Sequence, residues 1–120
     1  MQQAAQLSPQ PYLADLRVAR FYLSVAELEL ALQSLDESLH RAPAVALAET
    51  GSSSLRFQVA RSRAEAWRQR GDLQRALGFA EEAVELSPTD ATAWSELATL
   101  YALDGRTSDQ IEAEKRAAAR

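Results

Sequence analysis

The stretch Trp67 to Trp94, WRQRGDLQRALGFAEEAVELSPTDATAW, sets the pattern for the whole chain. An apolar helical pattern ends at Gly71, a second begins after Asp72 and ends before Pro88, and a third follows. Glycine suits the left-handed residue that ends a helix, because it takes a positive φ without steric cost. The stretch therefore predicts a helix, a tight turn, a second helix and another turn.

The same features recur at a fixed spacing of 34 residues. The recurring pairs are Gly71 with Gly105, Trp67 with Tyr101, and Ala64 with Ala98. A period of 34 is that of the tetratricopeptide repeat. The stretch resembles this family in its aromatic residue before the turn, its Gly-Asp turn, Ala76 and Ala83 in the second helix, and the closing Leu86-Ser87-Pro88.

The resemblance implies an all-α fold, a right-handed α-solenoid of antiparallel helix pairs. We divide the chain by this register into the tail of a truncated upstream repeat (1–11), repeat 1 (12–45), an inserted loop (46–56), repeat 2 (57–90), and repeat 3 with a polar capping helix (91–120). The tail is inferred from Leu7-Ser8-Pro9, which echoes the Leu-Ser-Pro at the end of repeat 2. The insertion is either a functional elaboration or a tolerated surface loop, and the second is favoured because such loops cost little.

Apolar periodicity and helix stop signals predict six main helices. They span 12–25, 27–42, 55–70, 73–86 and 91–104, with the last beginning at Thr107. Ala26 stands where the family has its turn glycine, so the first turn departs from the pattern. Thr107 followed by Gln110 predicts a capping box at the start of the last helix.

Composition limits the classes of function. The chain has 120 residues, no cysteine and a formal charge of −4, which argues against binding polyphosphate or anionic membrane as its main role. No apolar run approaches the ~20 residues needed to span a bilayer. We expect a soluble single domain without direct membrane insertion, with a cytoplasmic location favoured over a periplasmic one.

Residues for catalysis or metal binding are sparse. His40 is the single histidine, and without cysteine the chain cannot supply a conventional zinc site. The glycines are isolated, so no phosphate-binding loop is expected. The carboxylates of Glu81, Glu82, Glu85, Glu112 and Glu114 fall on solvated helix faces. We therefore expect no enzyme activity, no cofactor and no metal.

In proteins that this chain resembles, the first helix of each pair lines a concave groove that holds a partner peptide or helix. Carried over by position, the groove residues are Leu13, Leu16, Arg20, Leu23, Gln58, Arg61, Glu65, Arg68, Thr92, Ser95 and Thr99. Such a groove is apolar at one end, basic in the middle and hydroxylic at the other. It favours a protein or peptide partner with an acidic centre and an apolar end.

The family's clamp for a C-terminal carboxylate is not expected here. The chain has no asparagine, Lys115 is its only lysine, and Ser62, Thr92 and Glu96 occupy clamp positions. The arginines of residues 55–70 have two interpretations, a stripe that grips an acidic partner or a solvated face neutralised by Glu81, Glu82 and Glu85. Charged helix faces are usually of the second kind. Nucleic acid is not expected, because the aromatic residues are assigned to the core and the overall charge is negative.

Two alternatives to the groove remain open. One is oligomerisation, with a homodimer formed through an N-terminal apolar face around Leu13, Leu16 and Leu23. The other is an accessory segment of a larger enzyme or membrane-associated protein. The sequence does not identify the partner.

Overall fold

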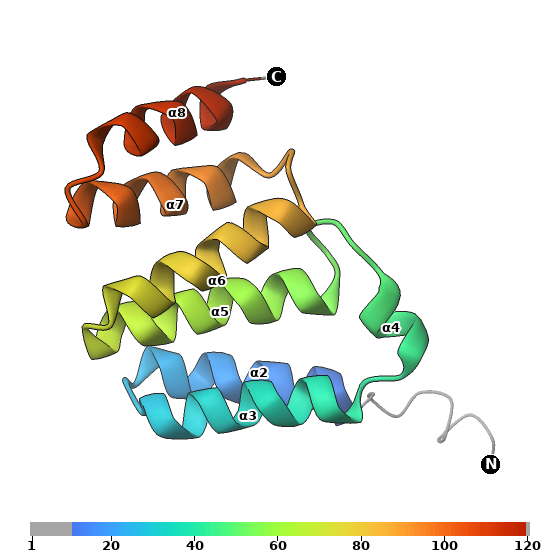
Figure 1. Ribbon diagram of the computed structural model, residues 1–120. Helices are drawn as coiled ribbons and strands as arrows, with labels where there is room; N and C mark the ends of the chain where they lie inside the picture. The colour runs from blue at the N-terminus through green and yellow to red at the C-terminus, as the bar shows by residue number, and fades with distance from the viewer. Residues whose placement is uncertain (1–10, 120) are drawn as a thin grey trace, which may run out of the picture.

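A computed structural model of the chain describes residues 11–119, which form helices and no strand (Figure 1). The helices are α2 (Pro11–Ser24), α3 (Leu28–Arg41), α4 (Ala44–Ala48), α5 (Leu55–Arg70), α6 (Leu73–Leu86), α7 (Ala91–Leu103) and α8 (Thr107–Ala118). The all-α prediction is therefore confirmed for this range. The predicted tail of an upstream repeat lies almost entirely outside the described residues.

The helices pack as successive antiparallel hairpins, α2 with α3, α5 with α6, and α7 with α8 (Figure 1). Neighbouring hairpins meet where α5 contacts both α2 and α3, and where α6 contacts α7. The short α4 lies at one edge of the stack. The result is an elongated body of 57 × 33 × 20 Å.

The predicted helix bounds agree closely with the structure. Helices α5 and α6 have the predicted ends, and α2, α3 and α7 differ from prediction by one residue at their ends. Because α5 begins at Leu55, the sequence-based division at residue 57 falls inside its first turn.

Three helix corners share one hydrogen-bond pattern. The backbone N–H of Glu27 donates to Tyr22 O at 2.8 Å, and Asp72 N donates to Trp67 O at 2.9 Å. Arg106 N donates to Tyr101 O, also at 2.9 Å. These are the six-to-one bonds of the Schellman motif, in which a left-handed residue lies between the two partners.

The left-handed residue of each corner is Ala26, Gly71 or Gly105, with φ of 61°, 86° and 75° respectively. Ala26 is the only non-glycine residue with positive φ within residues 11–119. Its Cβ makes this conformation unfavourable by about 1–2 kcal/mol. The first turn thus keeps the geometry of the others without their glycine.

Side chains cap three of the helices. Asp72 Oδ1 accepts from Arg75 N at 3.1 Å, Asp90 Oδ1 accepts from Ala93 N at 2.9 Å, and Ser54 Oγ accepts from Phe57 N at 3.2 Å. Such caps satisfy backbone N–H groups that have no partner within the helix.

The capping box predicted at Thr107 is wrong. The N-cap of α8 is Arg106, which makes no side-chain capping bond, and Thr107 is already helical. The reason is the corner geometry, which places the residue after Gly105 at the N-cap, as it places Asp72 after Gly71. Gln110 instead donates from Nε2 to Glu114 Oε2 at 3.0 Å.

The core has two clusters that meet at α5. The smaller cluster joins α2, α3 and α5 through Leu16, Ala19, Leu35, Leu55 and Val59. The larger cluster joins α5 to α6, α7 and α8, and includes Phe57, Ala76, Leu77, Leu97 and Ala113. Helix α5 is therefore covered on two sides, which places it at the centre of the stack.

The inserted segment is hydrogen-bonded to the end of α6 and to the turn that follows it. Gly51 N donates to Leu86 O at 2.9 Å, and Ser52 Oγ donates to Asp90 Oδ2 at 2.6 Å. The hydroxyls of Ser52 and Ser87 also lie 2.8 Å apart. The loop that leads into α5 is thus tied to the turn between α6 and α7.

Candidate binding groove

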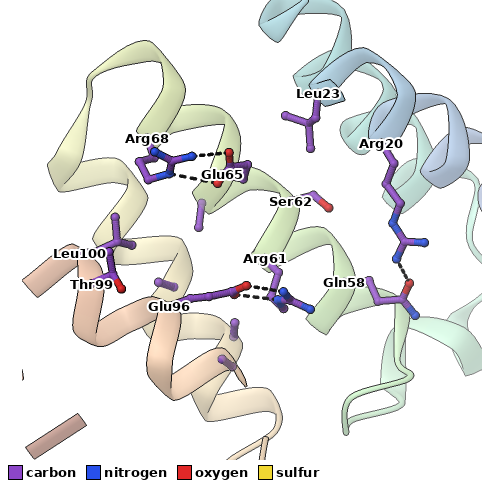
Figure 2. A pocket seen from close by; sticks show the side chains of 14 residues that line it. Arg20, Leu23, Gln58, Arg61, Ser62, Glu65, Arg68, Glu96, Thr99 and Leu100 are labelled. Carbon is purple, nitrogen blue, oxygen red and sulfur yellow. Dashed lines mark hydrogen bonds and ion pairs between the residues drawn. The ribbon is translucent and has the colours of Figure 1, made fainter. Parts of the chain in front are cut away.

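A hollow of about 530 Å³ lies across one face of the stack, bordered by α2, α5, α6 and α7 (Figure 2). Its floor consists largely of small side chains from three helices. They are Ala64 of α5, Ala80 and Ala83 of α6, and Ala93 of α7. The alanines leave space between helices that larger side chains would fill.

The hollow brings together seven of the residues predicted for the groove. These are Arg20, Leu23, Gln58, Arg61, Glu65, Arg68 and Thr99. They come from the first helix of each hairpin, α2, α5 and α7. Figure 2 shows Arg61, Arg68 and Glu65 on α5 between Arg20 of α2 and Thr99 of α7.

The other four predicted residues lie elsewhere. The prediction that Leu16 lines the groove is wrong. Its side chain is 3% exposed and packs in the smaller core cluster against α3 and α5. Leu13 is 37% exposed and does not line the hollow. Thr92 and Ser95 are exposed on α7 outside it. The apolar end of the predicted groove is therefore reduced to Leu23.

Sequence reasoning did not assign Ser62, Glu96, Leu100 or the floor alanines to the groove. Ser62 and Glu96 had been considered only as clamp positions. The signal for the floor was present in the alanines of α5 and α6, which the sequence places at apolar helical spacing. Which of these alanines line the hollow could not be predicted, because that depends on how the hairpins pack against one another.

Charges in the middle of the groove are paired internally. Arg61 Nε donates to Glu96 Oε1 at 2.8 Å, and its Nη2 pairs with Glu96 Oε2. Arg68 makes the same two-pronged contact with Glu65, at 3.0 and 2.5 Å. Bidentate contacts of this kind are the strongest form of arginine–carboxylate pairing.

The ionisation of these groups follows from the pairing. The hydrogen bond that Arg61 donates to Glu96 raises the pKa of Arg61 against the opposing effect of burial. For Glu65, burial favours the neutral acid, but hydrogen bonds from Arg68 and Gln69 outweigh it and lower the pKa. An acidic ligand in the middle of the groove would therefore have to compete with Glu65 and Glu96 for these arginines.

The arginines of α5 other than Arg56 pair with acids, but not with those predicted. Arg63 pairs with Asp36 of α3 at 2.5 Å, and Arg70 pairs with Glu29 of α3. Glu81 instead accepts a hydrogen bond from Tyr101. The prediction that Glu81, Glu82 and Glu85 neutralise this face is wrong, because the opposing surface is α3 and α7 as well as α6.

Arg20 is the arginine of the hollow that has no carboxylate partner within residues 11–119. Its guanidinium donates to Gln58 Oε1, while Gln58 Nε2 donates to Ser53 O at 3.0 Å (Figure 2). The positive charge available to a ligand therefore lies at the α2 edge, next to Leu23, and not in the middle.

A second hollow of about 340 Å³ lies beside the inserted segment. Leu47 of α4 and Leu39 of α3 line it together with Val59 and Ala60 of α5, and Arg56, Arg63 and Glu82 complete its lining. The insertion thus covers part of the side of α5 and contributes to this surface.

Within the described range, no three histidine or acidic side chains gather closely enough to hold a metal ion. The helices of residues 11–119 are also too short and too polar for any of them to cross a membrane. Comparisons with known proteins add nothing further, since neither a protein-family model nor a curated protein matches the sequence.

Proposed function

We propose that the chain is a right-handed α-solenoid of tetratricopeptide type that acts as a non-catalytic scaffold for protein interaction. It binds a partner peptide or helix in the groove formed by α2, α5 and α7. The chain catalyses no reaction. It binds through a preformed surface that is complementary to the partner in shape and charge.

The repeat character is supported by the three equivalent corners. Tyr22, Trp67 and Tyr101 each accept the same six-to-one backbone bond, and each is a large aromatic residue. The second and third are 34 residues apart, and the first precedes the second by that period plus the eleven inserted residues. Equivalent corners, one period apart once the insertion is set aside, are typical of a stack of homologous hairpins.

The single observation that carries the binding function is the alanine-floored hollow. It crosses three hairpins, and its volume lies within the range of ligand sites, about 300–1,000 Å³. Its floor is apolar and its rim carries charged and hydroxyl groups. An apolar side chain of a partner would fill the floor, where buried apolar area contributes about 25 cal/mol per Å².

Arg20 sets the preferred charge of the partner. Because Arg61 and Arg68 are already paired, a carboxylate gains most beside Arg20. The expected partner segment therefore carries a bulky apolar residue for the floor and an acidic residue directed toward α2.

The test is selection of a random peptide library on the immobilised chain, followed by affinity measurement of enriched peptides. Enriched peptides should combine an apolar anchor with an acidic residue. Thr99→Trp, which fills the rim of the hollow, should abolish binding, and Arg20→Glu should weaken binding of the acidic peptides about tenfold or more. Arg17→Glu on the same helix is the matched control and should bind normally.

Two outcomes would reject the proposal. One is a selection without enrichment over a blank surface. The other is a set of peptides that bind the Thr99→Trp chain as tightly as the original. Circular dichroism of each variant establishes that the helices remain intact.

A further inference from the structure

Gln58 is the residue through which the inserted segment reaches the groove. Its Oε1 accepts a hydrogen bond from Arg20 of α2 (Figure 2). Its Nε2 donates to the backbone carbonyl of Ser53 at 3.0 Å. A carbonyl oxygen only accepts and a guanidinium only donates, so these two partners fix which end of the amide faces Arg20. The side chain of Gln58 therefore has one orientation that satisfies both neighbours.

Ser53 belongs to a turn that is itself held in place. The backbone N–H of Ser54 donates to Gly51 O at 3.0 Å, and the Ser54 hydroxyl donates to the same carbonyl at 2.8 Å. Ser52 Oγ donates to Asp90 Oδ2 at 2.6 Å, which joins the turn to the start of α7. The fold therefore sets the place of the Ser53 carbonyl at the start of α5.

The arginines that line the hollow have different kinds of partner. Arg61 makes two contacts with the carboxylate of Glu96. Arg68 makes two contacts with the carboxylate of Glu65. Arg20 instead donates to a neutral amide. Because an amide oxygen binds a guanidinium without neutralising it, Arg20 keeps its charge while its side chain is held at the edge of the hollow.

We propose that Gln58 determines the charge selectivity of the groove, because it orients Arg20 without neutralising it. This inference rests on the proposed function of the groove. A glutamate at position 58 has the same length and would leave each arginine of the hollow paired with a carboxylate. The choice of amide or carboxylate at this one position therefore separates a groove that prefers acidic partners from one that lacks the preference.

The inserted segment takes part in binding through the same contact. A carboxylate has no proton to donate to Ser53 O, so that carbonyl favours glutamine over glutamate at position 58. The residues of the insertion do not line the hollow themselves. They act on the groove by holding Gln58, which favours a functional elaboration over a tolerated surface loop.

Fluorescence anisotropy of two labelled peptides tests the inference. One is an acidic peptide enriched on the immobilised chain, and the other is the same peptide with its acidic residue replaced by the corresponding amide. The ratio of their dissociation constants measures charge selectivity and is insensitive to losses that affect both peptides equally. Gln58→Glu should lower the ratio about tenfold or more, to the level of Arg20→Met. Gln58→Met, which removes both hydrogen bonds without adding charge, should lower it about threefold.

A double-mutant cycle separates positioning of Arg20 from a general effect on the groove. In the Arg20→Met chain, Gln58→Met should leave the ratio unchanged, because no guanidinium remains to be oriented. Gln74→Met is the matched control. Gln74 Nε2 also donates to an acceptor distant in sequence, Asp104 Oδ1 at 3.1 Å, but the residue does not line the hollow, so the ratio should stay as in the original chain.

Three outcomes would overturn the inference. An unchanged ratio in Gln58→Glu, or an equal effect of Gln58→Met with and without Arg20, would do so while leaving the groove as a binding site. Failure of the enriched peptides to bind the original chain in solution would reject the proposed function and this inference together. Circular dichroism of each variant establishes that the helices are retained.

Discussion

The phenol of Tyr101 donates a 2.7 Å hydrogen bond to Glu81 Oε2 and so joins α7 to the middle of α6. Tyr101 is 9% exposed, and it also supplies the backbone carbonyl of the third Schellman corner. One residue therefore ends a helix and fastens adjacent hairpins together. Arg106, from the same corner, lies over its ring at 4.7 Å from the centroid.

Burial, together with the hydrogen bond to Glu81 and the negative charge of that residue, raises the pKa of Tyr101 to about 12. Because the folded protein holds this proton more tightly than the unfolded chain, the contribution to stability is present below pH 10 and is lost as the pH rises toward 12. Absorbance at 295 nm should show a tyrosine step near pH 12 that Tyr101→Phe removes. In Glu81→Gln the step should move down but stay above 10, because burial is the larger cause. A step unchanged in Tyr101→Phe would contradict this.

Ala26→Gly should stabilise the fold by about 0.5–1 kcal/mol, because it removes the strain of a left-handed alanine while adding some chain entropy to the unfolded state. Urea unfolding should show the gain as a higher midpoint at unchanged slope. Gly71→Ala is the matched reverse change. A Cβ at Gly71 would meet nothing within 4 Å. The Gly71→Ala variant should therefore lose about 1 kcal/mol of unfolding free energy through backbone strain alone.

The hydrogen bond from Ser52 lowers the pKa of Asp90 below the ordinary value of 3.8 against the opposing effect of burial, and the bond that Asp90 accepts from Ala93 N as the N-cap of α7 lowers it further. A carboxylate with a lowered pKa adds stability above its unfolded pKa, and this is lost as the pH falls through the folded value. Asp90→Ala should cost about 1–2 kcal/mol at pH 7 and less at pH 3. Asp90→Asn keeps an acceptor for Ala93 N and should flatten the acid limb of the stability profile. An equal loss at both pH values for Asp90→Ala would count against the carboxylate's role.

Leu16→Ala should destabilise the fold by about 2–4 kcal/mol, because the side chain is buried between α2, α3 and α5 and its removal leaves a cavity. Leu13→Ala, on the same helix but 37% exposed, should cost less than about 1 kcal/mol. Chemical denaturation of both variants makes the comparison. Similar losses of stability in the two variants would show that α2 does not bury Leu16 against α3 and α5.

Glu96→Gln should increase the affinity of the groove for acidic peptides by about three- to tenfold, because it releases Arg61 from its bidentate partner. The gain should shrink at high salt, where exposed charges are screened. Stability should change by less than about 1 kcal/mol, as is usual for exposed pairs. Fluorescence anisotropy of a labelled groove peptide at two salt concentrations measures the effect, and an unchanged affinity at low salt would place the acidic group of the ligand away from Arg61.

Helix bounds and corners were predictable because they depend on local chemistry. Gly71, Asp72 and Pro88 each act on the backbone within a few residues, and a spacing of 34 repeats their effect. Ala26 ends its helix in the same left-handed conformation as Gly71, although its Cβ makes that conformation less favourable. The capping box at Thr107 failed although its signal is also local, because the cap position was fixed by the corner before it.

The sequence by itself determined that this chain forms helices, where those helices end, and which residue types line the first helix of each hairpin. Only the tertiary structure decided that Leu16 is buried while Val18 and Phe21 are exposed, since periodicity places apolar residues on nearly every side of α2. It also decided that Arg61 and Arg63 pair with Glu96 and Asp36, because partners distant in sequence are selected by how the hairpins pack. Local backbone bonds are encoded residue by residue, whereas the choice of buried face and of ion-pair partner depends on surfaces that exist only after the hairpins have come together.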